Sequence, residues 1–277
     1  MKILILAAVV WLPLFADVED RSTETRAFTG GRLVIVDNVN GSIEVAGELA
    51  GSDQNEVRVE VSKRIQAETP ERLEAARREV KLEMEQSGDT VKLYVDGPFR
   101  CQCGDRSPRS QHEGYSVGFD FKVTAPRSAR VDLYTVNNGH IIVRGIVGDF
   151  NISNVNGGIE MTDIGGSGHA RTVNGPVKVA FARNPVAASA FETVNGSVDV
   201  TFRRGLAADV RVDTLHGGVF TDFEVAALPQ SQPEKRDGHY VFHGRTSGVR
   251  IGGGGVEVKM KTINGDILIR EQETQHP

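Results

Sequence analysis

The sequence of 277 residues has few aromatic side chains, only two cysteines and no excess of positive charge. Phe, Trp and Tyr together make up 6% of the residues, and the formal net charge at pH 7 is −5. An acidic chain lacks the basic surface that nucleic acids and anionic membranes attract, so we expect neither as a partner. With 39% hydrophobic residues the chain still has enough apolar material for a folded core, which excludes global disorder.

The chain also lacks an apolar run long enough to cross a membrane. Its N-terminus combines Lys2, an apolar run of 14 residues over 3–16 and the small residue Ala16, followed by the acidic run 17–20. A membrane-spanning helix needs about 20 apolar residues. The pattern therefore predicts a signal peptide over residues 1–16, with a retained anchor as the alternative. We expect an exported protein, periplasmic or at the cell surface, whose mature chain has no transmembrane span.

The only two cysteines, Cys101 and Cys103, are separated by a single residue. In an oxidising compartment such a pair is read as a local disulfide, although so tight a ring is strained and easily reduced. Free thiols are one alternative. Metal or redox chemistry with His112 is another, but structural zinc sites normally have four ligands. We predict no cofactor and no metal on this basis.

Alternation of apolar and polar residues predicts several strands in the first half of the chain. Residues 31–45 contain two β-rich runs, and residues 56–65 alternate apolar and charged side chains. Residues 79–85 and 90–95 alternate in the same way around a Ser-Gly-Asp turn, which predicts a hairpin. A further strand is predicted over 120–124.

One helix is predicted between these strands. Thr69 can cap its N-terminus, and Pro70 suits the first helical position. Leu73, Ala76 and Val80 then recur at three- and four-residue intervals, which places them on one face.

The patterns divide the chain into five segments. These are a signal peptide (1–16), an N-terminal β-rich segment with one helix (17–100), a cysteine-containing loop (101–117), a repeat domain (118–270) and a polar tail (271–277).

Glycine is abundant, with 31 residues, or about 11% of the chain against an average near ~7%. The glycines do not recur every third residue, which excludes collagen. Many of them end Asn-Gly turns that form an internal repeat with spacings of 18, 18, 21, 21 and 48 residues, the last containing an insertion over about 221–250. Asn40-Gly41 is an outlying copy near the N-terminus, and Thr-(Val/Leu/Ile) precedes most turns. The predicted repeat corners are Asn40, Gly41, Asn138, Gly139, Asn156, Gly157, Asn174, Gly175, Asn195, Gly196, His216, Gly217, Asn264 and Gly265.

The repeat predicts an all-β fold, specifically a β-solenoid resembling a parallel β-helix, with coils of 18–21 residues and a small N-terminal cap of strands, helix and hairpin. Glycine and asparagine accept the backbone conformations of tight corners, and the flanking β-branched residues favour strands. Single units cannot bury their apolar row, whereas stacked units form a continuous core. Corner asparagines would then hydrogen-bond along the stack. The rival architecture is an antiparallel meander in which Asn-Gly forms two-residue hairpin turns.

These motifs also carry a resemblance to a known family. The run Thr-Val-Asn-Gly-x-(Ile/Val)-x-Val is repeated after a Pro-containing strand and closed by residues 252–256 and 262–267. Over residues 30–270, including the helix, the chain resembles the bacterial putative-adhesin family of exported β-strand-repeat proteins, a family of unknown function. The resemblance implies an exported β-solenoid-like domain in the cell envelope and no enzyme activity.

No catalytic signature stands out in the sequence. None of the seven histidines forms a His-Glu-x-x-His zinc motif, and we predict no catalytic, cofactor-binding or metal residue. Some parallel β-helix proteins cleave acidic polysaccharides with clustered acids and bases on one face. Asp149, Asp163, Arg144 and Lys178 are candidates for such a cluster, with scattered surface charges as the alternative.

The leading interpretation is a non-enzymatic, exported β-repeat protein that acts as a binding or structural module at the bacterial cell envelope. Extended repeat surfaces suit contacts with an envelope protein or a glycan. The alternatives are a polysaccharide-active β-helix enzyme and an envelope regulator with a redox-sensitive cysteine pair.

Overall fold

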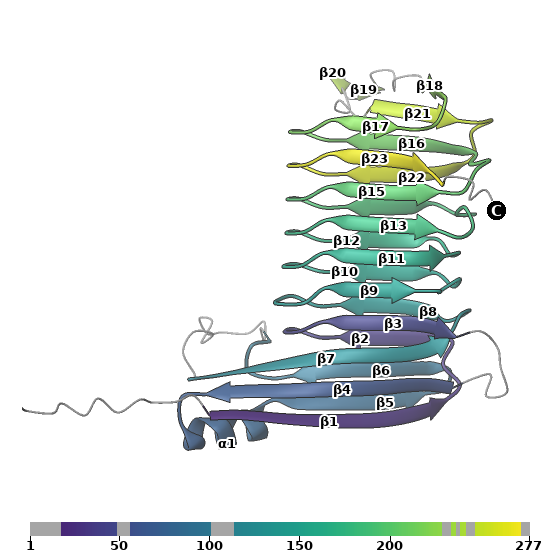
Figure 1. The fold of residues 1–277 in the computed structure, drawn as a ribbon. Helices are drawn as coiled ribbons and strands as arrows, with labels where there is room; N and C mark the ends of the chain where they lie inside the picture. The colour runs from purple at the N-terminus through teal and green to yellow at the C-terminus, as the bar shows by residue number, and fades with distance from the viewer. Residues whose placement is uncertain are drawn as a thin grey trace, which may run out of the picture.

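The structure, a computed structural model, describes the chain over residues 18–48, 56–100, 114–228, 234–236, 239–241 and 247–272. Within these residues the fold is all-β, as predicted, with two large mixed sheets, a two-stranded sheet and one short helix. Figure 1 shows the strands of the two large sheets lying side by side along the length of the molecule. The predicted signal peptide and both cysteines lie outside the described residues.

The first large sheet has ten strands, drawn from both ends of the chain. Their order is β1 (Val18–Thr29), β4 (Glu56–Ala67), β7 (Tyr115–Pro126), β3 (Ile43–Glu48), β9 (Ile141–Arg144), β11 (Ile159–Ile164), β13 (Val177–Phe181), β15 (Val198–Phe202), β23 (Ile267–Glu271) and β17 (Val219–Thr221).

The second large sheet has eleven strands. Their order is β18 (Val225–Ala227), β21 (Ser247–Ile251), β16 (Ala208–Asp213), β22 (Val256–Lys261), β14 (Ser189–Glu192), β12 (Gly168–Arg171), β10 (Phe150–Ser153), β8 (Arg130–Tyr134), β2 (Leu33–Asp37), β6 (Thr90–Asp96) and β5 (Lys81–Ser87). The short strands β19 (Glu234–Arg236) and β20 (His239–Val241) pair only with each other among the described residues.

The helix and the hairpin after it form where the local pattern predicts them. The helix α1 (Pro70–Glu79) begins at Thr69, whose hydroxyl oxygen accepts a hydrogen bond from the Arg72 N–H at 3.3 Å. Its apolar residues Leu73 and Ala76 are buried. β5 and β6 then form an antiparallel hairpin around Gly88, whose φ of +57° suits glycine. These elements lie at the end of the molecule that β1 and β5 border (Figure 1).

Over residues 130–202 the strands alternate between the two sheets and pair in parallel. β8, β10, β12 and β14 are neighbours in the eleven-stranded sheet, and β9, β11, β13 and β15 are neighbours in the ten-stranded sheet. Each Asn-Gly corner lies where the chain passes from the eleven-stranded sheet to the ten-stranded sheet. The corners therefore do not form antiparallel hairpins, and the predicted alternative of a meander is wrong for this region.

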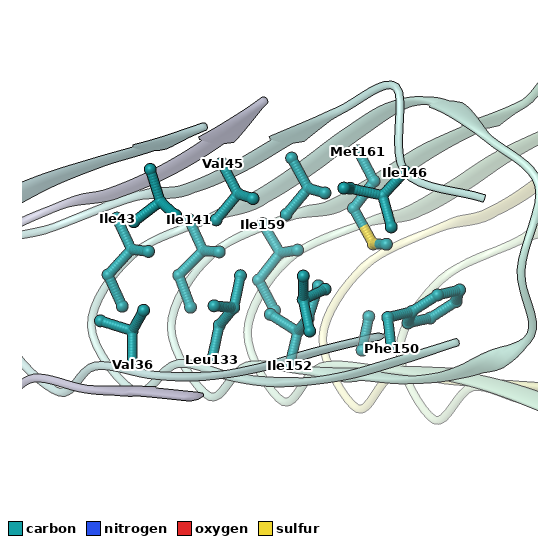
Figure 2. Packing of buried hydrophobic residues seen from close by; sticks show 14 of the residues in the cluster. Val36, Ile43, Val45, Leu133, Ile141, Ile146, Phe150, Ile152, Ile159 and Met161 are labelled. Atoms are coloured by element: carbon teal, nitrogen blue, oxygen red, sulfur yellow. The ribbon is translucent and has the colours of Figure 1, made fainter. Parts of the chain in front are cut away.

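We call one strand of the eleven-stranded sheet, the corner after it and the next strand of the ten-stranded sheet a repeat unit, and we name each unit by its corner residue. The Asn156 unit, for example, consists of β10, the corner and β11. Figure 2 shows how neighbouring units share a core. Ile43, Ile141 and Ile159 form a row in register on one sheet, and Val36, Leu133 and Ile152 face them from the other. All six are at most 1% exposed, so the core is a continuous apolar layer between the sheets.

The spatial order of the units differs from their order in the sequence. The Asn264 unit, β22 with β23, lies between the Asn195 unit and the His216 unit, and pairs in parallel with both. The chain therefore passes one position beyond the Asn195 unit, forms β18 and β21, and returns to fill the position between. The outlying Asn40 corner likewise belongs to a full unit, β2 with β3, which pairs in parallel with β8 and β9. The spacing of the corners in the sequence did not show where the Asn264 and Asn40 units lie in the stack. Their corners offer neighbouring units much the same hydrogen-bonding groups as the other corners do.

Candidate functional site

The corner glycines lie directly against the backbone of the neighbouring unit. A Cβ atom at Gly157 would come closer than 3.0 Å to the carbonyl oxygen of Gly139. The same holds for Gly175 against Gly157 and for Gly196 against Gly175. Because adjacent strands are only about 4.8 Å apart, a corner that passes over another corner has no room for a side chain.

The threonine before most turns has a specific partner in the neighbouring unit. The hydroxyl of Thr172 donates to the carbonyl oxygen of Gly157 at 2.8 Å, and that of Thr193 donates to Gly175 at the same distance. Thr262 donates to Gly196 at 2.9 Å. These hydroxyls satisfy corner carbonyls that would otherwise be buried without a partner, which explains the Thr-(Val/Leu/Ile) pattern in the sequence.

The corner asparagines form a continuous hydrogen-bonded ladder on the outside of the corners. The side-chain amide of Asn174 donates to the side-chain oxygen of Asn156, and Asn195 donates to Asn174, both at 2.8 Å. Asn264 continues the ladder by donating to Asn195 at 2.7 Å. Since each amide serves its neighbour, the ladder holds the units in register and is not free to bind a ligand through those groups.

The Asn174→Ala substitution tests the ladder, because it removes one donor bond and one acceptor bond. We expect the free energy of unfolding to fall by about 1–2 kcal/mol, since a net hydrogen bond contributes about 1 kcal/mol. Denaturant unfolding followed by circular dichroism measures the change. Lys178→Ala, at an exposed position without an ion pair among the described residues, should change it by less than about 0.5 kcal/mol. Equal effects of the two substitutions would contradict a stabilising ladder.

One predicted corner is displaced by a single residue. Asn137, and not Asn138, occupies the ladder position: its side-chain oxygen accepts from Asn156 at 3.0 Å, and its backbone bridges to Asn40. Asn138 has a φ of +56°, the left-handed conformation that asparagine tolerates, and forms one additional residue in this turn. Gly139 keeps its place in the glycine column, which is why the spacing of the glycines remained regular.

His216 stands in for asparagine at the last corner. Its Nδ1 lies 3.1 Å from the side-chain oxygen of Asn264. The amide of Asn264 already donates to Asn195, so the oxygen of Asn264 faces His216 and the imidazole must donate from Nδ1–H. The histidine therefore has a structural role at the end of the ladder.

The other predicted candidates are not gathered into one site. Asp149 accepts from the backbone N–H of Ser167 beside the eleven-stranded sheet, whereas Arg144, Asp163 and Lys178 belong to strands of the ten-stranded sheet. Arg144 pairs with Glu44, and Asp163 pairs with Arg127 at 2.6 Å. The four residues therefore do not form the candidate cluster of acids and bases, and the alternative of scattered surface charges describes them. Asp149 lies beside a different sheet from the other three, and Arg144 and Asp163 are each held by a partner outside the set.

The described part of the chain contains no candidate metal site. No group of three or more His, Cys, Asp or Glu side chains there could hold an ion. Nor does any helix among those residues have the length and apolar character to cross a membrane. The Cys101–Cys103 pair and His112 fall in a segment outside the description.

A groove of about 480 Å³ crosses the outward face of the eleven-stranded sheet. It extends over β8, β10, β12, β14 and β22, and a second hollow of about 420 Å³ adjoins it. The two share Asn151, His169 and Ala188, so they form one continuous depression. We call this depression the sheet groove.

The sheet groove is hollow because one small residue stands between larger ones. His169, Ala190 and Lys259 are direct neighbours in register on adjacent strands, and the methyl group of Ala190 leaves a gap between the two longer side chains. The connection 182–188, which joins β13 to β14, contributes Ala187 and Ala188 to its lining. The extra length of this connection accounts for the 21-residue spacing between the Asn174 and Asn195 corners.

A tyrosine hydroxyl lies at one end of the sheet groove with its proton free to donate. The amide of Asn151 donates to the Tyr134 hydroxyl oxygen at 2.6 Å, which leaves the tyrosine O–H as a donor. Burial raises the pKa of Tyr134, and the nearby carboxylates of Asp132 and Asp37 raise it further. The hydroxyl therefore stays protonated across the physiological pH range.

Most charged groups around the sheet groove are paired, but Arg171 is not. Lys259 contacts Glu192 at 2.8 Å, and Arg211 contacts Glu257 at 2.8 Å. Arg171 is exposed beside Glu192, and no carboxylate among the described residues lies within ion-pair distance of it. The groove therefore contains one guanidinium that is not held by a carboxylate among the described residues.

Sequence reasoning missed this groove, although its signal is present in the repeat. Residues three positions before the corner form one outward column, and residues five positions before it form a second. The first column contains Tyr134, Ser153, Arg171, Glu192 and Lys261, and the second contains Asp132, Asn151, His169, Ala190 and Lys259. Aligning these columns on the corners would have shown that these residues face outward together, but not that Lys259 lies beside Ala190.

Comparisons with known proteins give distant structural neighbours only. No family model matches the sequence, and no curated protein matches it. A putative cell adhesion protein from Clostridium sporogenes is similar in structure, with a TM-score of 0.44 and 10% identity over 91% of this chain and 100% of its own. A putative adhesin from Bacteroides fragilis has a TM-score of 0.39 and 11% identity over 91% of this chain and 97% of its own.

Proposed function

We propose that this protein is an exported, non-enzymatic binding module of the bacterial cell envelope, and that the sheet groove is its ligand site. We further propose that its repeat units, the Asn40 unit included, form a two-sheet β-solenoid, with β1, β4, α1 and the β5–β6 hairpin contributing the N-terminal cap. The parallel pairing of alternate strands supports the solenoid. The single observation that carries the function is the groove itself, which combines a continuous depression with the unpaired donors of Arg171 and Tyr134.

Binding is favoured over bond cleavage by the state of the groove's carboxylates. Hydrolysis of a glycosidic bond normally needs two carboxyl groups, one acting as an acid and the other as a base or nucleophile. Glu192 and Glu257 are each held by a cation, Lys259 and Arg211 respectively. A ligand can thus be oriented by donors here without a pair of free carboxyl groups positioned to attack it.

Filling the groove tests the proposal. In Ala190→Trp, an indole would occupy the gap between His169 and Lys259, while the buried face of β14 stays unchanged. We expect wild-type protein immobilised on beads to retain components of a solubilised bacterial envelope fraction, and Ala190→Trp to lose them. Retained material is measured by mass spectrometry and by carbohydrate analysis.

The matched control is Ala180→Trp, an outward position of equal size on β13 of the ten-stranded sheet. It should retain the same material as wild type, because it lies on the opposite face. The proposal would be abandoned if Ala190→Trp and Ala180→Trp retained envelope material equally well, or if wild type retained none.

A further inference from the structure

We propose that the sheet groove binds an extended acidic glycan, with Arg171 holding a carboxylate of the ligand and Tyr134 donating a hydrogen bond to a neighbouring sugar oxygen. This inference rests on the proposed function and names the class of ligand.

The shape of the groove indicates an elongated ligand. It crosses five adjacent strands, from β8 to β22, which are four strand spacings or about 19 Å apart. Tyr134 and Arg171 lie in the same outward column with Ser153 between them, so about 10 Å separates their backbone positions. A ligand that reaches both groups must run across the strands, along the direction in which the repeat units follow one another.

The unused groups of the groove select a ligand rich in hydrogen-bond acceptors. The guanidinium of Arg171 has five N–H groups and can bind a carboxylate through two parallel hydrogen bonds. The Tyr134 hydroxyl has its proton free, since its oxygen accepts from Asn151. His169 is exposed on β12, next to Ala190 of β14, and adds a ring nitrogen to the same surface as Tyr134 and Arg171. An acidic sugar supplies a carboxylate together with ring and hydroxyl oxygens, which matches this set.

An extended peptide fits the same surface less well. Peptides that bind to sheets add to an exposed edge through their backbone, or insert apolar side chains into pockets. The groove lies on the face of the sheet, where the backbone groups of β10, β12 and β14 are already used in parallel pairing. None of the large exposed apolar residues among those described lines the groove, although Val186 lies in the connection 182–188 beside it. Leu215, Val219 and Phe220 belong to the His216 unit at the far end of the sheets.

The experiment compares acidic oligosaccharides with their neutral methyl esters, which have the same backbone, and with a neutral glucan. Size-defined oligogalacturonates, their methyl esters and neutral dextran oligomers are titrated into the full-length mature protein by isothermal titration calorimetry. We expect the oligogalacturonates to bind, with an affinity that falls as salt is raised, because the contact at Arg171 is ionic. Methyl esters and dextran should bind at least about tenfold more weakly, since they lack the charge that a bidentate contact requires.

Three variants assign the contacts. Arg171→Gln should weaken oligogalacturonate binding by about tenfold or more, and Tyr134→Phe by a smaller factor of about three to ten, because a charged hydrogen bond contributes more than a neutral one. Lys178→Gln is the matched control, an exposed cation on the ten-stranded sheet that forms no ion pair among the described residues; it should bind as wild type does. Unfolding curves verify that all three variants are folded.

Two results would overturn the inference: equal affinity for the acid and its methyl ester, or wild-type affinity in Arg171→Gln. If Ala190→Trp loses envelope components while no acidic oligomer binds to wild type, the groove is a ligand site for another class of molecule. In that case the proposed function stands and the acidic glycan is rejected. If Ala190→Trp retains every component, the groove itself is rejected.

Discussion

Replacing Ile267 with asparagine should release the strands on both sides of the Asn264 unit, although these lie far apart in the sequence. Ile267 is fully buried in β23 and pairs in register with Val198 of β15 and Val219 of β17. The substitution removes a buried apolar side chain and leaves an amide without partners. We expect the free energy of unfolding to fall by about 4 kcal/mol or more.

Hydrogen–deuterium exchange read out by mass spectrometry shows which strands lose protection. We expect faster exchange in β15 and β17, and also in β14 and β16, which β22 joins in the other sheet. If the units instead followed one another in sequence order, the last unit would contact only the His216 unit. Protection of β15 unchanged from wild type would therefore contradict the observed placement.

The next residue provides the control. Leu268 lies on the outward face of the same strand, between Asp199 and Phe220, and is half-buried. Leu268→Asn should cost less than about 1 kcal/mol, because its side chain leaves no cavity in the core. The contrast between two adjacent positions separates core packing from any general weakness of β23.

The second large effect is expected from a corner glycine. Gly196 has a φ of +155°, and a Cβ atom there would come closer than 3.0 Å to the carbonyl oxygen and carbon of Gly175. That carbonyl oxygen also accepts from Thr193, so it cannot move away without breaking a buried hydrogen bond. We expect Gly196→Ala to lower the free energy of unfolding by about 3 kcal/mol or more, from overpacking and backbone strain together.

Two other glycines separate these causes. Gly88 has a φ of +57° with open space around its Cα, so Gly88→Ala should cost about 1 kcal/mol from conformation alone. Gly253 has open space and no positive φ, so Gly253→Ala should have almost no effect. The denaturant midpoint should be lowest for Gly196→Ala, intermediate for Gly88→Ala and highest for Gly253→Ala. A Gly196→Ala variant as stable as Gly253→Ala would show that the units can move apart at the corner.

The helix and the corner columns were predictable because their causes are local or periodic. Thr69 caps α1 through a residue three positions away, and the apolar spacing of Leu73 and Ala76 defines its buried face. Corner asparagines and glycines act on the equivalent residue of the next unit, so a regular spacing in the sequence becomes a regular contact in space. Only the turn at Asn138 escaped this reasoning, because one residue in the left-handed conformation shifted the ladder to Asn137.

The groove and the order of the units could not be predicted in the same way. Ala190 creates a hollow only when His169 and Lys259 stand on either side of it, and Lys259 comes from the displaced Asn264 unit. In sequence order, Arg211 of the His216 unit would have taken the place of Lys259 beside Ala190. The shape and charge of the proposed site therefore depend on a long-range placement.

The amino-acid sequence by itself determined that the chain is all-β, where its helix begins and how its corners are spaced, because the glycines, asparagines and threonines recur with a regular period. Only the tertiary structure decided which unit lies beside which. The units offer the same backbone edge and, apart from the His216 unit, the same Asn-Gly corner, so local preference does not distinguish one neighbour from another. The choice is made by the whole core and by the path of the chain between β17 and β22, and it sets the side chains that line the sheet groove.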